Sequence, residues 1–125
     1  MNILRKFRRV AAAMTAAFCC LTAFSVQAET FMSVKDVQPG MTGYAKTVAH
    51  GRKIETFPVE VLGIMKNAGP SGDLILAKFS GPLIEESGGI AQGMSGSPVY
   101  INGKLVGAVA YGWSFTKSRM GMITP

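Results

Sequence analysis

The sequence predicts a mainly β, barrel-like protein from three observations. Apolar residues occur in short runs, 15 of the 125 residues are glycine, and turn-forming pairs separate the runs. No amphipathic helix is expected beyond a short turn at Ser33–Val37. The chain has neither internal repeats nor a low-complexity tail. We therefore expect a compact set of strands joined by tight turns.

Residues 1–28 have the pattern of a secretory signal peptide. Residues 1–9 carry four basic side chains, residues 10–24 are apolar and small, and Ala28 stands at the cleavage position. The apolar run is shorter than the ~20 residues that a membrane-spanning helix needs, which favours cleavage over an uncleaved anchor. We expect export to the periplasm, the cell envelope or the medium, with no stable membrane span after cleavage.

The composition of the remaining chain, residues 29–125, excludes several classes of function. Both cysteines, Cys19 and Cys20, leave with the signal, so no disulfide is expected. Nine basic and seven acidic residues remain, and a net charge of about +2 is not that of a nucleic-acid-binding protein. No cofactor or metal is expected, because the sequence has no His/Cys cluster and no glycine-rich loop before a helix.

Short apolar segments bounded by turn-forming residues mark the expected strands. The first two form a hairpin around a turn at Ala49–Arg52, and the last two are joined by Asn102-Gly103, a pair typical of two-residue hairpin turns. Glu85 and Glu86 are expected in a solvated loop. In chain order, the expected strands are residues 47–48, 53–55, 57–64, 73–79, 99–101 and 104–111.

The strongest chemical signal is the run Gly93-Met94-Ser95-Gly96-Ser97-Pro98, which directly precedes the last hairpin. A serine hydroxyl becomes an effective nucleophile when the backbone presents it openly and donors stabilise the oxyanion that it creates. Gly93 and Gly96 can adopt dihedral angles forbidden to other residues. We therefore predict Ser95 as a nucleophile, with the amides of Gly93 and Ser95 as an oxyanion hole. An ordinary structural turn is the alternative.

Residues 93–108, from the serine motif through the hairpin, closely resemble the SpoIVB peptidase family of bacterial serine peptidases, which have a chymotrypsin-like character. Residues 39–44, 59–63 and 80–85 are similar to further blocks of its envelope members, so the resemblance covers Val34 to Pro125. It implies a partial chymotrypsin-like β-barrel, Ser95 as the nucleophile, and a protein or peptide substrate.

Two residues depart from the chymotrypsin pattern. Met94 replaces the aspartate that pairs there with a newly cut amino terminus, so activation by that ion pair is unavailable. Ser97 replaces a glycine, and in an extended segment it would share a face with Ser95. Ser97 is therefore the fallback nucleophile, although a turn residue that bonds its own backbone is the favoured interpretation.

The general base is the weakest part of the predicted site. His50, Asp73 and Ser95 follow the chain order of chymotrypsin-like triads, with His50 as base and Asp73 as its orienter. Both His50 and Asp73 also stand in expected turns, where exposed polar residues are common. In the envelope members that the chain resembles, the histidine lies well downstream of the serine. We therefore expect an amino-terminal fragment of a longer peptidase, with the base outside this chain.

Two function hypotheses follow. The first is an exported serine endopeptidase that acts through an acyl-enzyme, and the second is a non-catalytic β module that binds peptides or envelope partners. The module would recruit extended peptides at a free strand edge such as Val59–Ile64. A third interpretation is that the chain is a non-functional fragment of a disrupted gene. Tyr111 and Trp113 would line a substrate cleft in a peptidase, although closing the edge of the core is the favoured role.

Overall fold

The computed structural model describes residues 28–112 and 119–125, so the predicted signal peptide up to Gln27 and also Trp113 lie outside the described residues. A 3-10 turn, η2 (Val34–Asp36), precedes the strands, and a short helix, α2 (Pro82–Ser87), lies between the third and the fourth. The strands of the described part are β1 (Thr42–His50), β2 (Lys53–Gly69), β3 (Gly72–Phe79), β4 (Pro98–Ile101), β5 (Lys104–Gly112) and β6 (Met120–Thr124).

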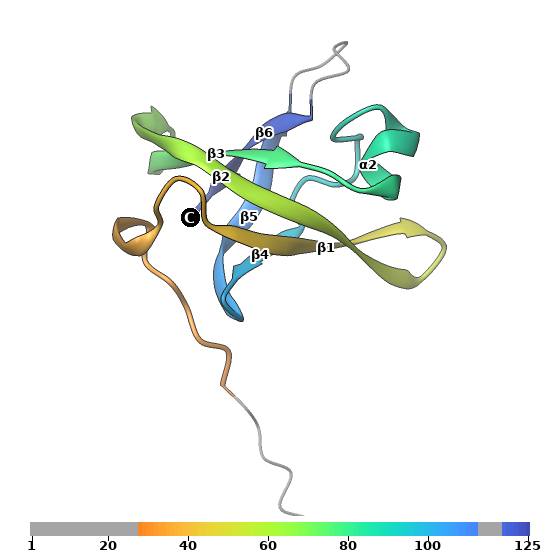
Figure 1. Ribbon diagram of the computed structural model, residues 1–125, viewed down its shortest axis with the longest axis horizontal. Coiled ribbons are helices and arrows are strands. Elements are labelled where there is room, and N and C mark those ends of the chain that lie inside the picture. The colour runs from red at the N-terminus through yellow and green to blue at the C-terminus, as the bar shows by residue number, and fades with distance from the viewer. Residues whose placement is uncertain (1–27, 113–118) are drawn as a thin grey trace, which may run out of the picture.

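These strands form one antiparallel barrel (Figure 1). The order around the barrel is β1-β2-β3-β6-β5-β4, and each strand pairs with two neighbours because β1 also pairs with β4. Where the strands pair, closure of this kind removes the free edges that an open sheet would leave. The prediction of a mainly β, barrel-like fold is confirmed.

The barrel closes between β1 and β4 through three residue pairs centred on Tyr44 and Tyr100. The two tyrosine rings stack with centroids 5.3 Å apart, and the ammonium of Lys46 lies 4.8 Å from the Tyr100 centroid. Gly43 permits the close approach of the strands, since a Cβ atom there would overlap the carbonyl oxygen of Tyr100. These three residue pairs, here called the seam, therefore fix the position of β1 relative to β4.

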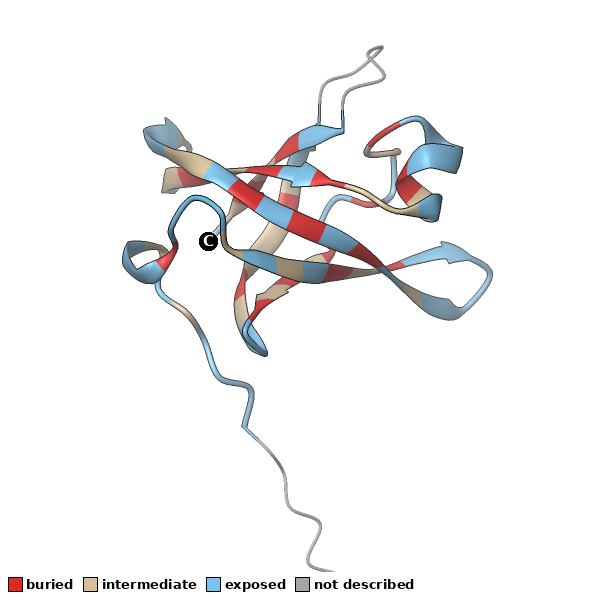
Figure 2. Ribbon diagram, in the orientation of Figure 1, coloured by how far each residue is buried: buried red, intermediate tan, exposed pale blue. Residues whose placement is uncertain are grey.

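The core consists of the inward-facing residues of the strands, which alternate with exposed residues along β2 and β3 (Figure 2). This period of two is the one that a half-buried strand requires. The rings of Phe57 and Phe79 meet edge to face with centroids 5.7 Å apart. The largest fully buried side chains are Phe57, Phe79, Ile75, Ile84, Ile101, Ile123, Val61, Val99 and Val109.

Helix α2 was not expected from the sequence, and it corrects the assignment of Glu85 and Glu86 to a loop. Pro82 occupies the first turn of the helix, and Gly88 ends it in a left-handed conformation with φ 72°. Its six residues span less than two turns, so they show no helical period in the sequence. Ile84 points into the core and anchors the helix to the barrel.

The edge that the binding hypothesis requires, Val59–Ile64, is not free at its start. It pairs with β3 on one side, while β1 pairs with it up to Glu60 on the other. Beyond Glu60, the amide of Val61 donates to the carbonyl of Met41, and the carbonyl of Val61 accepts from the amide of Gly40. The expectation of a free strand edge is therefore wrong for the part of β2 from Val59 to Val61.

Within residues 28–112 and 119–125, none of the helices has the length and hydropathy of a bilayer-spanning segment.

Candidate active site

Residues 93–98 form the turn that leads from α2 into β4, and the backbone of β5 holds this serine turn in place. The amide of Gly96 donates to the carbonyl of Val109 over 2.7 Å, and the amide of Val109 donates to the carbonyl of Ser97 over 2.9 Å. A third bond, 3.1 Å long, joins the amide of Ser97 to the carbonyl of Met94 inside the turn. These bonds fix the position of the backbone on both sides of Ser95.

Adjacent residues of the serine turn point in opposite directions. Met94 is buried in the core, whereas Ser95 is exposed. The Ser95 hydroxyl donates to the carbonyl of Ala110, with an Oγ···O distance of 2.9 Å. Burial of Met94 therefore anchors the turn and leaves the Ser95 hydroxyl accessible from solvent. In the chymotrypsin pattern an aspartate stands at the position of Met94, and here that position belongs to the hydrophobic core.

The glycines beside Ser95 have the conformations that the motif predicted. Gly93 has φ 93° and Gly96 has φ 85°, a region in which residues with a Cβ atom are strained. A Cβ atom built on Gly93 meets nothing within 4 Å, so the surface above it is open. Among residues 28–112 and 119–125, no hydrogen bond engages the amide of Gly93 or that of Ser95. Both amides therefore remain available as donors to a bound oxyanion.

Two pockets meet at Gly93 and Ser95. One of about 380 Å³ lies toward the hairpin of β1 and β2, with Val48, Ile54 and Pro98 among its lining residues. The other, of about 320 Å³, lies toward the end of β5 and includes Tyr111. Tyr111 is 44% exposed and lines this pocket, which agrees with the alternative that it lines a cleft. A substrate has room on both sides of the serine.

His50 stands at the end of β1, on the projecting hairpin. Its Nδ1 lies 3.0 Å from Oε2 of Glu55, and 64% of its side chain is exposed. His50 lines a third pocket of about 310 Å³ together with Gly93 and Met94, but Ser95 is not among the residues of that pocket. The Ser95 hydroxyl bonds a carbonyl oxygen and not this imidazole.

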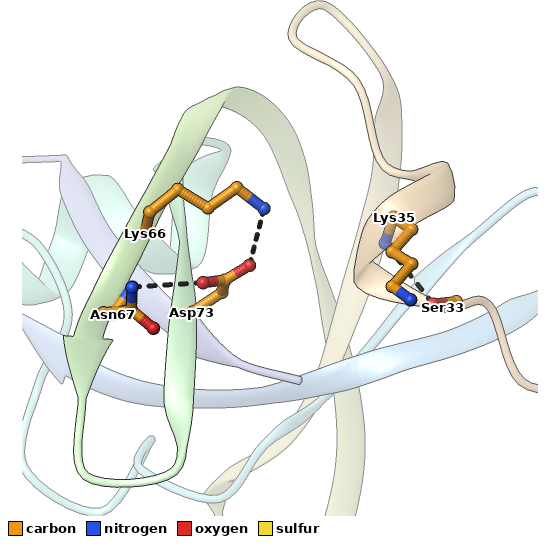
Figure 3. A network of polar contacts seen from close by, with 5 residues as sticks. All are labelled: Ser33, Lys35, Lys66, Asn67 and Asp73. Atoms are coloured by element: carbon orange, nitrogen blue, oxygen red, sulfur yellow. Dashed lines mark hydrogen bonds and ion pairs between the residues drawn. The ribbon is translucent and has the colours of Figure 1, made fainter.

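Asp73 lies at the hairpin of β2 and β3, the other end of β2 from His50 (Figure 1). Its carboxylate accepts a 2.7 Å bond from Nζ of Lys66 and a 3.1 Å bond from the amide of Asn67 (Figure 3). The hydrogen bond from Lys66, followed by that from Asn67, lowers the pKa of Asp73 below its ordinary value. The structure therefore does not bring Asp73 to His50 or Ser95, and Asp73 is a partner of Lys66.

Ser97, the fallback nucleophile, is buried, and both its amide and its carbonyl are bonded within the turn and to β5. Ser97 is therefore a turn residue, but among the described residues its hydroxyl makes no hydrogen bond to its own backbone, so that part of the interpretation is not confirmed. The Glu55 partner of His50 was missed, although the predicted hairpin contained the signal. His50 pairs with Lys53 across the hairpin, and the residue two positions along from a cross-strand partner lies within reach of a long side chain.

Within the described ranges, no three His, Cys, Asp or Glu side chains gather in a way that could hold a metal ion. The arrangement at the serine turn instead provides an open hydroxyl, two unengaged amides and room on both sides. This combination suits attack on a carbonyl carbon with stabilisation of the resulting oxyanion.

Comparisons with known proteins give one match. The family model described as SpoIVB peptidase S55 matches residues 21–121, which include the whole serine turn and five complete strands. No curated protein and no solved structure matches the chain. The matched range covers most of the sequence, and on this ground the chain belongs to the SpoIVB peptidase S55 family.

Proposed function

We propose that the protein is an exported serine endopeptidase that cleaves polypeptides through an acyl-enzyme formed on Ser95. Membership of a peptidase family supports hydrolysis of peptide bonds. The observation that carries the assignment to Ser95 is the serine turn, in which an exposed hydroxyl stands beside two amides that have no bond among the described residues.

In the proposed reaction, Oγ of Ser95 attacks the carbonyl carbon of the scissile bond while a general base accepts the hydroxyl proton. The amides of Gly93 and Ser95 donate to the oxyanion of the tetrahedral intermediate. The C–N bond then breaks, and the base returns its proton to the leaving amine. Water hydrolyses the resulting ester and restores the Ser95 hydroxyl.

The base is proposed to be a histidine that residues 1–125 do not supply. His50 is the one histidine of the sequence, and its Nδ1 is paired with Glu55 at a pocket that does not include Ser95. The Ser95 hydroxyl points at the carbonyl of Ala110, which cannot serve as a base. A histidine that approaches Ser95 from its solvent side would complete the catalytic set.

Cleavage of labelled casein by the natural protein, isolated from the producing cells, tests this proposal. Ser95→Ala should lower kcat/KM by roughly 10³-fold or more, because nucleophile and base act as a unit. Ser71→Ala is the matched control, because Ser71 is exposed in the turn between β2 and β3 and lines neither of the two pockets at Ser95, and we expect about the activity of the unchanged protein. Equal cleavage by the Ser95→Ala protein would refute the assignment.

Export is the part of the proposal that rests on the sequence pattern of residues 1–28. Amino-terminal sequencing of the protein from the envelope and secreted fractions tests it. We expect a chain that begins at Glu29. A chain that retains Met1 and residues 2–28, found in the cytoplasm, would contradict export and leave the assignment of Ser95 standing.

A further inference from the structure

Beyond Ala45, β1 separates from β4 and leaves an open strand edge next to the serine turn. The pairing of β1 with β4 ends at Ala45↔Val99, whereas β1 continues to His50 with β2 on its other side. Among the described residues, the stretch 46–50 therefore has no strand partner where β4 has departed. Val48, Ala49 and His50 are exposed there, whereas Thr47 is buried. Extended peptides bind to such edges as an added strand.

The pocket on the hairpin side of Ser95, here called the hairpin pocket, has apolar walls. Val48 and Ile54 come from the projecting hairpin and Pro98 from the start of β4, and Ser95 and Gly96 also line the pocket. The exposed fractions are 52% for Val48 and 66% for Ile54, the latter the second highest among the large hydrophobic residues described. Apolar side chains that cluster in the open beside a reactive group mark a binding surface.

The charges of the hairpin pocket exclude one class of substrate residue. Its lining contains Lys46 but no carboxylate. The Lys46 ammonium lies over the rings of Tyr44 and Tyr100, 5.9 and 4.8 Å from their centroids, so it is directed toward the aromatic pair. A basic side chain of a substrate would find no partner in this pocket and would lose its hydration there.

We propose that the hairpin pocket selects the substrate: it receives one apolar side chain next to the scissile bond, while residues 46–50 of β1 bind the substrate backbone. This inference rests on the proposed function and adds the class of cleavage site. The volume of about 380 Å³ lies at the small end of ligand pockets, which suits a side chain and not a folded domain. Val48 and Ile54 are then specificity-determining residues.

The first test is a profile of cleavage sites. A peptide library is digested by the natural protein and by its Ile54→Ser and Met65→Ser variants, and the cleaved bonds are identified by mass spectrometry. Met65 is the matched control, because it lies on the same strand, is 42% exposed and is not among the lining residues of the pocket. With the natural protein and the control, we expect apolar residues to dominate one position of the peptides, counted from the cleaved bond, and Lys and Arg to be depleted at that position. With the Ile54→Ser variant, the enrichment of apolar residues at that position should fall about tenfold. A profile unchanged by Ile54→Ser would overturn the inference.

A second test measures binding without cleavage. The Ser95→Ala protein is titrated with an alanine-rich decapeptide that carries one Leu, and amide resonances of residues 46–50 are followed by NMR. We expect saturable shifts, with a Kd about tenfold higher when Ile54→Ser is added or when Ser replaces the Leu of the peptide. Should the natural protein cleave nothing, this dependence on Ile54 would uphold the pocket while the peptidase proposal failed. Equal binding to all forms would overturn the pocket itself.

Discussion

The Ser95 hydroxyl donates a 2.9 Å hydrogen bond to the backbone carbonyl of Ala110 in β5. The bond fixes the hydroxyl of an exposed residue between two pockets. A carbonyl oxygen holds this proton at rest but does not accept it during a reaction, because a neutral amide is far too weak a base. In the proposed reaction the hydroxyl would therefore turn toward a base when a substrate binds, and the origin of that base is the first point to test.

Replacement of His50 decides whether the base lies in this hairpin. Because His50 is paired with Glu55 and does not bond Ser95, His50→Ala should change kcat/KM of the natural protein by less than about threefold, well below the 10²–10⁴-fold effect of a general base. The assay is casein cleavage across pH 5 to 8. A loss of about a hundredfold or more, together with loss of the acidic limb of the profile, would identify His50 as the base.

The position of Met94 predicts a sharp difference between two substitutions. Met94→Asp places a carboxylate in the core with no cationic partner shown there, so we expect a loss of more than about 3 kcal/mol in the free energy of unfolding. Met94→Leu keeps the volume and should cost less than about 1.5 kcal/mol. Urea unfolding followed by circular dichroism measures both. Equal stability of the two variants would mean that Met94 does not anchor the turn.

The seam between β1 and β4 predicts a second effect on stability. In Gly43→Ala, the new Cβ atom would overlap the carbonyl oxygen of Tyr100, so the strands must separate. We expect a loss of about 3 kcal/mol, the upper range for overpacking. Gly63→Ala is the control, because a Cβ atom there meets nothing within 4 Å. Similar unfolding curves for the two variants would contradict closure of the barrel at this seam.

The Asp73–Lys66 pair predicts a pH dependence of stability. The pKa of Asp73 is lowered in the folded protein, so the pair contributes stability above the pKa of the unfolded carboxyl, about 3.9. That contribution is lost as the pH falls through the lower, folded-state pKa. Asp73→Asn should therefore lower Tm at pH 7, and the difference from the natural protein should disappear in acid. A difference that is constant from pH 7 to pH 2 would show that the carboxylate charge is not its source.

Much of the local structure could be predicted from the sequence, because short-range signals determine it. The Asn102-Gly103 pair adopts positive φ at both residues, as its turn type requires, and the hairpin at Gly51 is also as expected. The conformations of Gly93 and Gly96 follow from the motif for the same reason. Each of these features depends on a few neighbouring residues.

The remaining features depend on contacts between residues far apart in the chain. The pairing of β1 with β4 brings Gly43 to Ile101, and no pattern in either segment specifies its partner. The chain order of His50, Asp73 and Ser95 is that of a triad, but order carries no distance. The 17 residues of β2 separate the two side chains: His50 lies beside the start of β2, and Asp73 lies beside its end. Only the folded chain reveals that separation.

Mapping the site of covalent labelling by a fluorophosphonate tests the central claim most directly. This reagent phosphonylates serine hydroxyls that are activated for attack, and digestion followed by mass spectrometry locates the adduct. The natural protein should carry one adduct, on Ser95, and Ser95→Ala should carry none while its circular dichroism stays unchanged. An adduct on Ser97, or an unlabelled natural protein, would contradict a nucleophilic Ser95.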